Sequence, residues 1–313
     1  MLIAQITDLH LGFEPNQIDE PNRHRLDQTI FRLSQGINQP DLIIATGDMV
    51  DRGDVDSYAR LRDAFSKATV PVYPMMGNHD DRDNFARIFS DVPMPDGFVQ
   101  YCVPLDGLRL VILDTLEPQR HGGAFCAVRS AWLSARLNED RETPTVIVMH
   151  HPPFEAGIAW MDTHPTEPWV QRFSDAIAGH TNIVAIWCGH LHRPIAAVWQ
   201  GICVTVCGST SAELTLDINM IDADLPVILM TGFGYDPHHS IGAIATGTMY
   251  AGSSSATKAR NASESGATPS RVTTCATNRR PTAGDTTAPS ASAPSSSTVP
   301  PPSPSSWPRP KAG

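Results

Sequence analysis

The sequence predicts an α/β fold in which buried strands alternate with amphipathic helices before a strand-rich second part. Two observations support this prediction. Short apolar runs recur along the chain, and in the first half they are separated by segments with apolar residues at helical spacing. Five of these runs lead directly into a polar motif containing Asp, Asn or His. Loops at the carboxyl ends of neighbouring strands meet at one edge of an open α/β sheet, so we expect the five motifs to converge.

The first half contains three apolar runs that we expect to be strands, at residues 2–7, 41–46 and 70–76. Two amphipathic segments are expected to form helices, at about 24–37 and around Tyr58, Leu61 and Phe65. The third run differs from the others because Pro71 and Pro74 cannot donate backbone hydrogen bonds. Such prolines are typical of an edge or irregular strand.

The second half contains mostly strands. We expect six of them, at residues 99–103, 108–113, 145–149, 183–188, 195–199 and 202–207. The first two are joined by the turn Asp106-Gly107 and the last two by Gln200-Gly201, so each of these pairs is expected to form a hairpin. One helix is expected at 129–138.

The composition changes near the C-terminus. From about Gly252, Ser, Thr, Ala and Pro dominate, and this part cannot bury enough apolar surface to offset its ordering entropy. We therefore predict a folded domain at 1–235, with 215–228 still compatible with strands, and a low-complexity, disordered tail at 236–313. The tail is either a genuine extension or the product of a shifted reading frame.

Charge and composition exclude several classes of protein. No run approaches the ~20 apolar residues of a membrane span, and no signal peptide is recognisable. The six cysteines form no C-x-x-C pair, so a reducing cytoplasm is the expected location, with one structural disulfide still allowed. Residues 251–313 carry seven Lys and Arg against two Asp and Glu, which leaves 16 basic and 31 acidic residues elsewhere. A body this acidic repels a nucleic-acid backbone.

The five motifs share residue types that bind metal ions. They are Asp8-Leu9-His10, Gly47-Asp48-Met49-Val50-Asp51-Arg52, Gly77-Asn78-His79-Asp80, His150-His151 and Gly189-His190-Leu191-His192. Each motif alone has an ordinary structural explanation, such as a turn or a solvated charge cluster. Together they supply more ligands than one ion can use, and a carboxylate such as that of Asp48 can bridge two ions. Carboxylate with imidazole suits Mn, Fe, Zn or Co better than Ca or Mg.

Three residues in the motifs are expected to have other roles. Asp51 can accept a hydrogen bond from a histidine and fix its tautomer. His79 can point at a substrate rather than at a metal. Pro152 forces His151 into an extended conformation, so that His150 and His151 point in opposite directions and only His150 is expected to bind metal.

In order and context the five motifs resemble the signature of the calcineurin-like metallophosphoesterase superfamily, D-x-H, G-D-x-x-D, G-N-H-[DE], H and G-H-x-H. The resemblance covers residues 1–235, which would be the catalytic domain. Residues 150–154, 157–162 and 188–194 are most similar to the branch of class III cyclic-nucleotide phosphodiesterases and glycerophosphodiesterases. The resemblance implies an α/β fold built as a four-layer α/β/β/α sandwich with two mixed sheets.

The resemblance also implies a site with two divalent or mixed-valence transition metal ions. The ligands of one ion would be Asp8, His10, Asp48 and His192. The ligands of the other would be Asp48, Asn78, His150 and His190. His79 would act as an acid outside the metal coordination sphere, oriented by Asp51, while a metal-bound hydroxide attacks phosphorus.

The expected substrate is a small phosphodiester, either a 3′,5′-cyclic nucleotide or a glycerophosphodiester. Three alternatives are a phosphomonoesterase of the same superfamily, a nuclease, and a non-catalytic scaffold that binds partners. The scaffold is disfavoured because no ligand is lost, and the nuclease because of the acidic body. His121, Trp160 and His164 are further candidates to line the substrate site, although surface or core roles are favoured for each. We expect no membrane and no extended nucleic acid as partners, and a homodimer or higher homo-oligomer is allowed.

Overall fold

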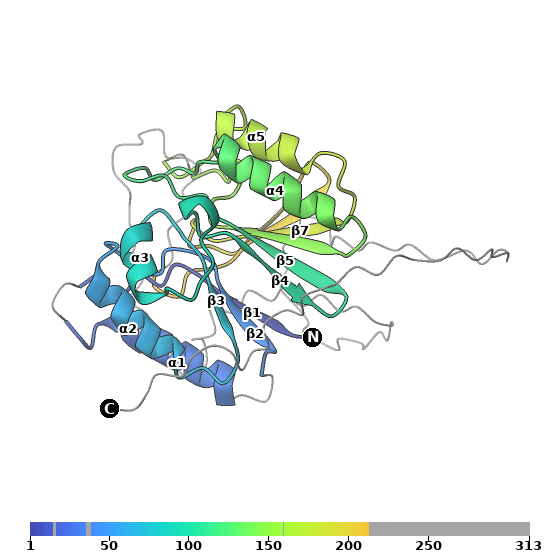
Figure 1. Ribbon diagram of the computed structural model, residues 1–313. Helices are drawn as coiled ribbons and strands as arrows, with labels where there is room; N and C mark the ends of the chain where they lie inside the picture. The colour runs from blue at the N-terminus through green and yellow to red at the C-terminus, as the bar shows by residue number, and fades with distance from the viewer. Residues whose placement is uncertain (15–16, 36–38, 159, 213–313) are drawn as a thin grey trace, which may run out of the picture. The chain divides into compact units, whose positions relative to one another are not determined.

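The computed structural model describes residues 1–14, 17–35, 39–158 and 160–212. The predictions for 215–228 and for the tail at 236–313 lie outside this part of the chain. Two sheets lie face to face (Figure 1). Helices α1 (Pro21–Gln35) and α2 (Val55–Phe65) lie outside one sheet, and α4 (Ala127–Glu139) and α5 (Pro168–Ile177) lie outside the other. This arrangement confirms the predicted α/β/β/α sandwich.

The first sheet has the order β1-β2-β3, with β1 (Ile3–Ile6), β2 (Leu42–Ala45) and β3 (Val72–Pro74). Both strand pairings are parallel. The expectation of a mixed sheet is therefore wrong for the described strands of this sheet, because a helix between consecutive strands returns the chain to its starting end. These helices are α1 (Pro21–Gln35), between β1 and β2, and α2 (Val55–Phe65), between β2 and β3. Helix α3 (Arg82–Ile88) follows β3 on the way to the second sheet. The proline-containing β3 lies at the edge of these three strands, as its sequence predicts.

The second sheet is mixed and has the order β4-β5-β6-β7-β9-β8. Its strands are β4 (Tyr101–Leu105), β5 (Leu108–Leu113), β6 (Thr145–Met149), β7 (Ile183–Cys188), β8 (Ile195–Trp199) and β9 (Ile202–Val206). The pairs β4–β5 and β8–β9 are antiparallel hairpins, which confirms both predicted turns. The other pairings are parallel. A short 3₁₀ helix (Pro95–Gly97) precedes β4.

Two of the described helices were not predicted. Helix α3 has only seven residues and fully buries a single apolar side chain, Phe85, so its periodicity is too short to recognise. Its start is marked by Asp81, whose carboxylate accepts a hydrogen bond from the Asn84 amide. Helix α5 (Pro168–Ile177) begins with proline and buries an apolar face against the second sheet together with α4 (Ala127–Glu139).

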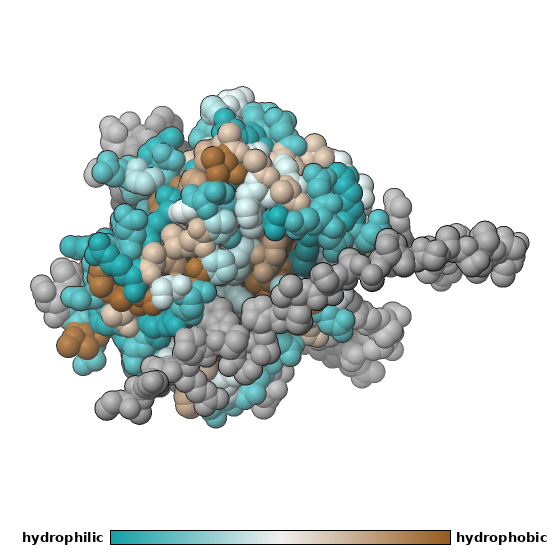
Figure 2. Space-filling model, viewed as in Figure 1, coloured by the Kyte–Doolittle hydropathy of each residue, from teal (hydrophilic) through white to brown (hydrophobic). Residues whose placement is uncertain are grey.

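Apolar surface is buried mainly between the layers. Strand β2 is entirely buried, and so is β6. The face shown in Figure 2 is mostly hydrophilic, and brown apolar residues appear there as small separate patches. Cys102, Cys126 and Cys188 are free thiols. Within the described ranges, no helix is long and apolar enough to cross a membrane.

Candidate metal centre

The five motifs meet where strands of both sheets end. The amide of Gly189, after β7, donates to the carbonyl of His150, after β6, at 3.0 Å. The amide of His190 also lies 3.2 Å from a carboxylate oxygen of Asp8, which follows β1 in the other sheet. The strands that carry the motifs are parallel to their neighbours within each sheet, so their motifs lie at the same end. The contacts between the sheets then bring the two sets of motifs together.

Backbone strain is concentrated at the candidate ligands. Five of them have positive φ angles: Asp8 (52°), His10 (46°), Asp48 (49°), His190 (74°) and His192 (53°). L-residues rarely adopt this left-handed conformation, and it persists only where the surrounding structure holds it. The surrounding structure therefore holds these loops in an unfavourable backbone conformation that brings the candidate ligands together.

Two motif glycines allow close approach between the loops. A Cβ atom on Gly77 would collide with the carboxylate of Asp48, and one on Gly47 would collide with the ring of His150. Any side chain at either position would displace a candidate ligand.

The first group of candidate ligands contains Asp8, His10, Asp48 and His192, whose ligand atoms lie within 4.8 Å of one another. The Nε2 atoms of His10 and His192 are 3.1 Å apart, and His192 Nε2 lies 3.3 Å from Asp8 Oδ1. Asp48 Oδ2 is 3.6 Å from His10 Nε2. The structure therefore brings together the four residues expected for the first ion.

The tautomers of these two histidines indicate that their Nε2 atoms can bind a cation. His10 Nδ1 donates to Asp51 Oδ1 at 3.2 Å, and His192 Nδ1 donates to the Ala212 carbonyl at 2.6 Å. When both imidazoles are neutral, both Nε2 atoms carry lone pairs, which cannot hydrogen-bond to each other. Lone pairs that face each other at this distance fit a cation.

The second group has the same property. His150 Nδ1 donates to the Thr46 carbonyl at 2.8 Å, so when the ring is neutral its Nε2 lone pair faces Asn78 Oδ1 at 3.2 Å and Asp48 Oδ2 at 3.3 Å. The Nδ1 atom of His190 is buried and has no hydrogen-bond partner among the described residues. A buried nitrogen without a partner is unfavourable unless it binds an ion, so these donors fit a metal.

Asp48 is shared by the two groups through one oxygen. Its Oδ2 faces both His10 and His150, whereas its Oδ1 accepts a hydrogen bond from the His79 amide at 2.9 Å. The carboxylate is therefore held with a single oxygen between the two candidate sites.

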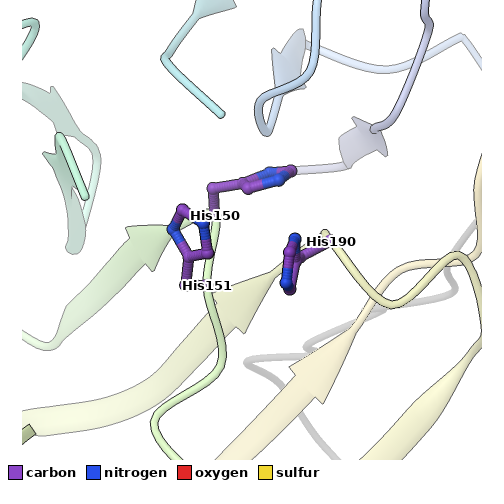
Figure 3. A group of neighbouring side chains, drawn as sticks. All are labelled: His150, His151 and His190. Carbon is purple, nitrogen blue, oxygen red and sulfur yellow. The ribbon is translucent and has the colours of Figure 1, made fainter. Parts of the chain in front are cut away.

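His151 lies beside this second group but has no free ring nitrogen. Figure 3 shows the rings of His150 and His151 turned in different directions after β6, with His190 beside them after β7. The Nδ1 atom of His151 accepts from the Thr115 hydroxyl at 2.8 Å, and its Nε2 donates to the His121 carbonyl at 3.0 Å. Burial and neighbouring His150 lower the pKa of His151 to about 3, so it stays neutral. Both ring nitrogens of His151 are thus used in hydrogen bonds within the protein.

Asp51 contacts two histidines, His10 and His79. His79 Nδ1 donates to the main-chain carbonyl of Asp51 at 2.9 Å, whereas the Asp51 carboxylate accepts from His10. Asp51 therefore fixes the tautomers of two histidines through two different groups. The His79 side chain is 31% exposed, against 8% for His10 and 13% for His192, which leaves it open to a substrate.

The buried charges depend strongly on one another. Burial lowers the pKa of His150, but the carboxylates of Asp48 and Asp8 and the Thr46 carbonyl together raise it to about 9. Burial alone would raise the pKa of Asp48, but the histidines around it hold it well below its usual value. Protons on the histidines compensate the carboxylates here, as cations would.

Three supporting residues were not identified from the sequence. Asp80 is buried and accepts from the amides of Met49 and Gly77 and from the Tyr58 hydroxyl. It stands in the G-N-H-D motif, which could have identified it. Asn22 and Ser209 donate to the carbonyls of His10 and Asp8, and nothing in their sequence context indicates this role.

The further candidates at the substrate site differ in position. The ring of His121 lies 6.2 Å from that of His79, centroid to centroid, which places it next to the site. His164 pairs with Glu155 within its own loop, and Trp160 is 36% exposed.

Comparison with known proteins relates this geometry to a family. The calcineurin-like phosphoesterase family model matches residues 1–194. A probable cyclic nucleotide phosphodiesterase of Rhodopseudomonas palustris is 33% identical over 64% of this chain and 75% of its own. A probable glycerophosphodiester phosphodiesterase of Arcobacter nitrofigilis is 27% identical over 70% of this chain and 81% of its own.

A solved structure shares the fold. The crystal structure of a dimetal phosphatase from Danio rerio superposes with a TM-score of 0.52 at 15% identity, over 67% of this chain and 88% of that one.

Proposed function

Since the chain belongs to the calcineurin-like phosphoesterase family, we propose that it is a dinuclear-metal phosphodiesterase that hydrolyses small phosphodiesters. The observation that carries this proposal is the set of facing lone pairs. His10 Nε2 faces His192 Nε2, and His150 Nε2 faces Asn78 Oδ1, with Asp48 Oδ2 near both pairs.

These donor atoms can be assigned to two metal ions. Asp8, His10, Asp48 and His192 would hold the first ion, and Asp48, Asn78, His150 and His190 the second. The bridging role would fall on Asp48 Oδ2, because Oδ1 is occupied by the His79 amide. Four imidazoles with carboxylate and amide oxygens favour Mn, Fe, Zn or Co over Ca or Mg.

The chemistry follows from the charges around this centre. Two bound ions supply Lewis acidity toward a phosphate oxygen and a water nucleophile at neutral pH. His79 would contribute a proton or hydrogen bond to the leaving oxygen through Nε2, because its Nδ1 is held by the Asp51 carbonyl. Asp51 would keep the ring of His10 oriented for metal binding through its carboxylate.

The substrate class is supported by the relatives. Both relatives described above are named as probable diesterases, one for cyclic nucleotides and one for glycerophosphodiesters. We propose the same two classes for this chain, with a diester preferred over a monoester.

A substrate panel tests the proposal. The purified protein, loaded with Mn²⁺, is compared on bis(4-nitrophenyl) phosphate, 4-nitrophenyl phosphate, cyclic AMP and glycerophosphoethanolamine. We expect turnover of the diesters, with a higher kcat/KM for the aryl diester than for the aryl monoester. A higher kcat/KM for the monoester would make the chain a phosphomonoesterase, and no turnover with Mn²⁺, Fe²⁺, Zn²⁺ or Co²⁺ would end the proposal.

A further inference from the structure

We propose that Ser209–Ala212, a segment outside all five motifs, is a positioning element for the first metal ion alone. The inference rests on the dinuclear centre proposed above. It assigns to these residues the task of holding two first-site ligands, Asp8 and His192, in their binding geometry.

The first contact is with the strained backbone of Asp8. Its carbonyl accepts from the Ser209 hydroxyl at 3.0 Å and from the Ser211 amide at 3.2 Å. The amide of Thr210 also donates to the carbonyl of Thr7 at 2.9 Å. Left-handed backbone is unfavourable for an L-residue other than glycine, so Asp8 needs such partners to remain at a φ of 52°.

The second contact is with the ring of His192. The Ala212 carbonyl accepts from His192 Nδ1 at 2.6 Å, which places the proton on Nδ1 and leaves Nε2 for the ion. One short segment therefore controls the backbone of one ligand and the tautomer of another.

Two of the ligands proposed for the second ion alone have supports that do not involve Asp8. His150 is held by the Thr46 carbonyl, and the loop that carries Asn78 is held by Asp80 through the Gly77 amide. The third, His190, contacts the Asp8 carboxylate only through its main-chain amide. Loosening Ser209–Ala212 is therefore expected to affect the first ion more than the second.

Within the segment, Ser209 is the residue to test. Its buried hydroxyl donates to Asp8 and accepts from the Ser211 amide at 2.9 Å, whereas the Ser211 hydroxyl contacts only the Ser209 hydroxyl among the hydrogen bonds of the described residues. Ser209→Ala removes a direct contact with Asp8, and Ser211→Ala removes a buried hydroxyl of the same size without touching Asp8. The two variants form a matched pair.

The experiment measures Mn²⁺ binding to the full chain by calorimetry and by the loss of the free Mn²⁺ EPR signal. We expect Ser209→Ala to weaken one of two binding steps by about 10-fold or more, the usual range for a residue that supports a metal ligand, and to change the other less than about 3-fold. Ser211→Ala should leave both steps within about 3-fold, and Ser209→Thr, which keeps the hydroxyl, should restore the weakened step.

Three results would overturn the inference. They are equal weakening of both steps in Ser209→Ala, no weakening of either, and the same loss in Ser211→Ala. Thermal unfolding of the metal-free variants separates a local effect from general destabilisation, which would weaken both steps. If the unmodified chain bound fewer than two ions, the dinuclear centre itself would be wrong, and this outcome is distinct from the other three.

Discussion

The two candidate metal sites share Asp48 but differ in what holds them. The first is assembled from distant parts of the chain: helix α1 through Asn22, the loop carrying Asp51, and the segment after β9. The histidines of the second are more deeply buried, with His150 completely buried and His190 3% exposed, whereas the His192 side chain of the first is 13% exposed. The difference teaches that two candidate sites that share one carboxylate can differ in how strongly each depends on loop contacts.

Asp48→Ala should have the largest effect because it is common to both sites. The Oδ2 atom of Asp48 faces both His10 and His150, so loss of this carboxylate should weaken the binding of both ions. Metal catalysis is worth several kcal/mol, so kcat should fall on the order of 10³-fold or more. Elemental analysis after gel filtration should find both ions depleted. Retention of one ion at full occupancy would show that the sites do not share this residue.

His79→Ala separates chemistry from metal binding. Its ring is held by the Asp51 carbonyl and is more exposed than the four histidines proposed as ligands, so both ions should stay bound. The value of kcat should fall about 10²–10⁴-fold, the usual contribution of a general acid. If His79→Ala also emptied a site, the residue would be a ligand and its proposed role wrong.

Asn78→Ala and Asp51→Ala form a pair that distinguishes the two sites. Asn78→Ala should lose mainly the second ion, because Asn78 Oδ1 faces His150. Asp51→Ala should weaken mainly the first, by about 10–100-fold, because it removes the carboxylate that orients His10. Mn²⁺ binding isotherms of both variants provide the check. The same binding step weakened in both variants would contradict two separate sites.

The buried, neutral His151 is expected to make the stability of the protein depend on pH, which is a smaller effect than those on activity. Its folded pKa of about 3 lies below the ordinary value of 6.5, so between these pH values the unfolded chain binds a proton that the folded chain does not. The contribution of this pKa shift to the free energy of unfolding is fully present above pH 6.5. It decreases as pH falls below 6.5, by at most about 1.4 kcal/mol per pH unit.

The check is denaturant unfolding of metal-free protein at pH 7, 6 and 5, compared with His151→Gln, which does not titrate. The slope of stability against pH should be smaller in the variant. Equal slopes would mean that His151 is protonated in the folded state.

The sequence was most informative where burial and chemistry coincide. Strands Thr145–Met149 and Ile183–Cys188 match their predicted ranges, because an uninterrupted apolar run between polar loops is compatible only with a buried strand of that length. The seven motif residues come together because each follows a strand end. Helix α3 was not recognisable because seven residues with one fully buried apolar side chain carry no periodic signal.

The supports of the centre were not predictable in the same way. Ser209 acts through a hydrogen bond to a residue 201 positions away, and a Ser-Thr-Ser loop is ordinary turn chemistry. The use of the Asp51 carbonyl, rather than its carboxylate, by His79 depends on loop conformation, which residue identity does not encode. Ligands can be read from residue types, whereas their supports require the fold.

The most direct test of the central claim is the rate of bis(4-nitrophenyl) phosphate hydrolysis as a function of bound Mn²⁺ per chain. Two unequal sites bridged by Asp48 predict little activity up to one equivalent and a steep rise as the second binds. Full activity at one equivalent, or none at two, would contradict a dinuclear centre.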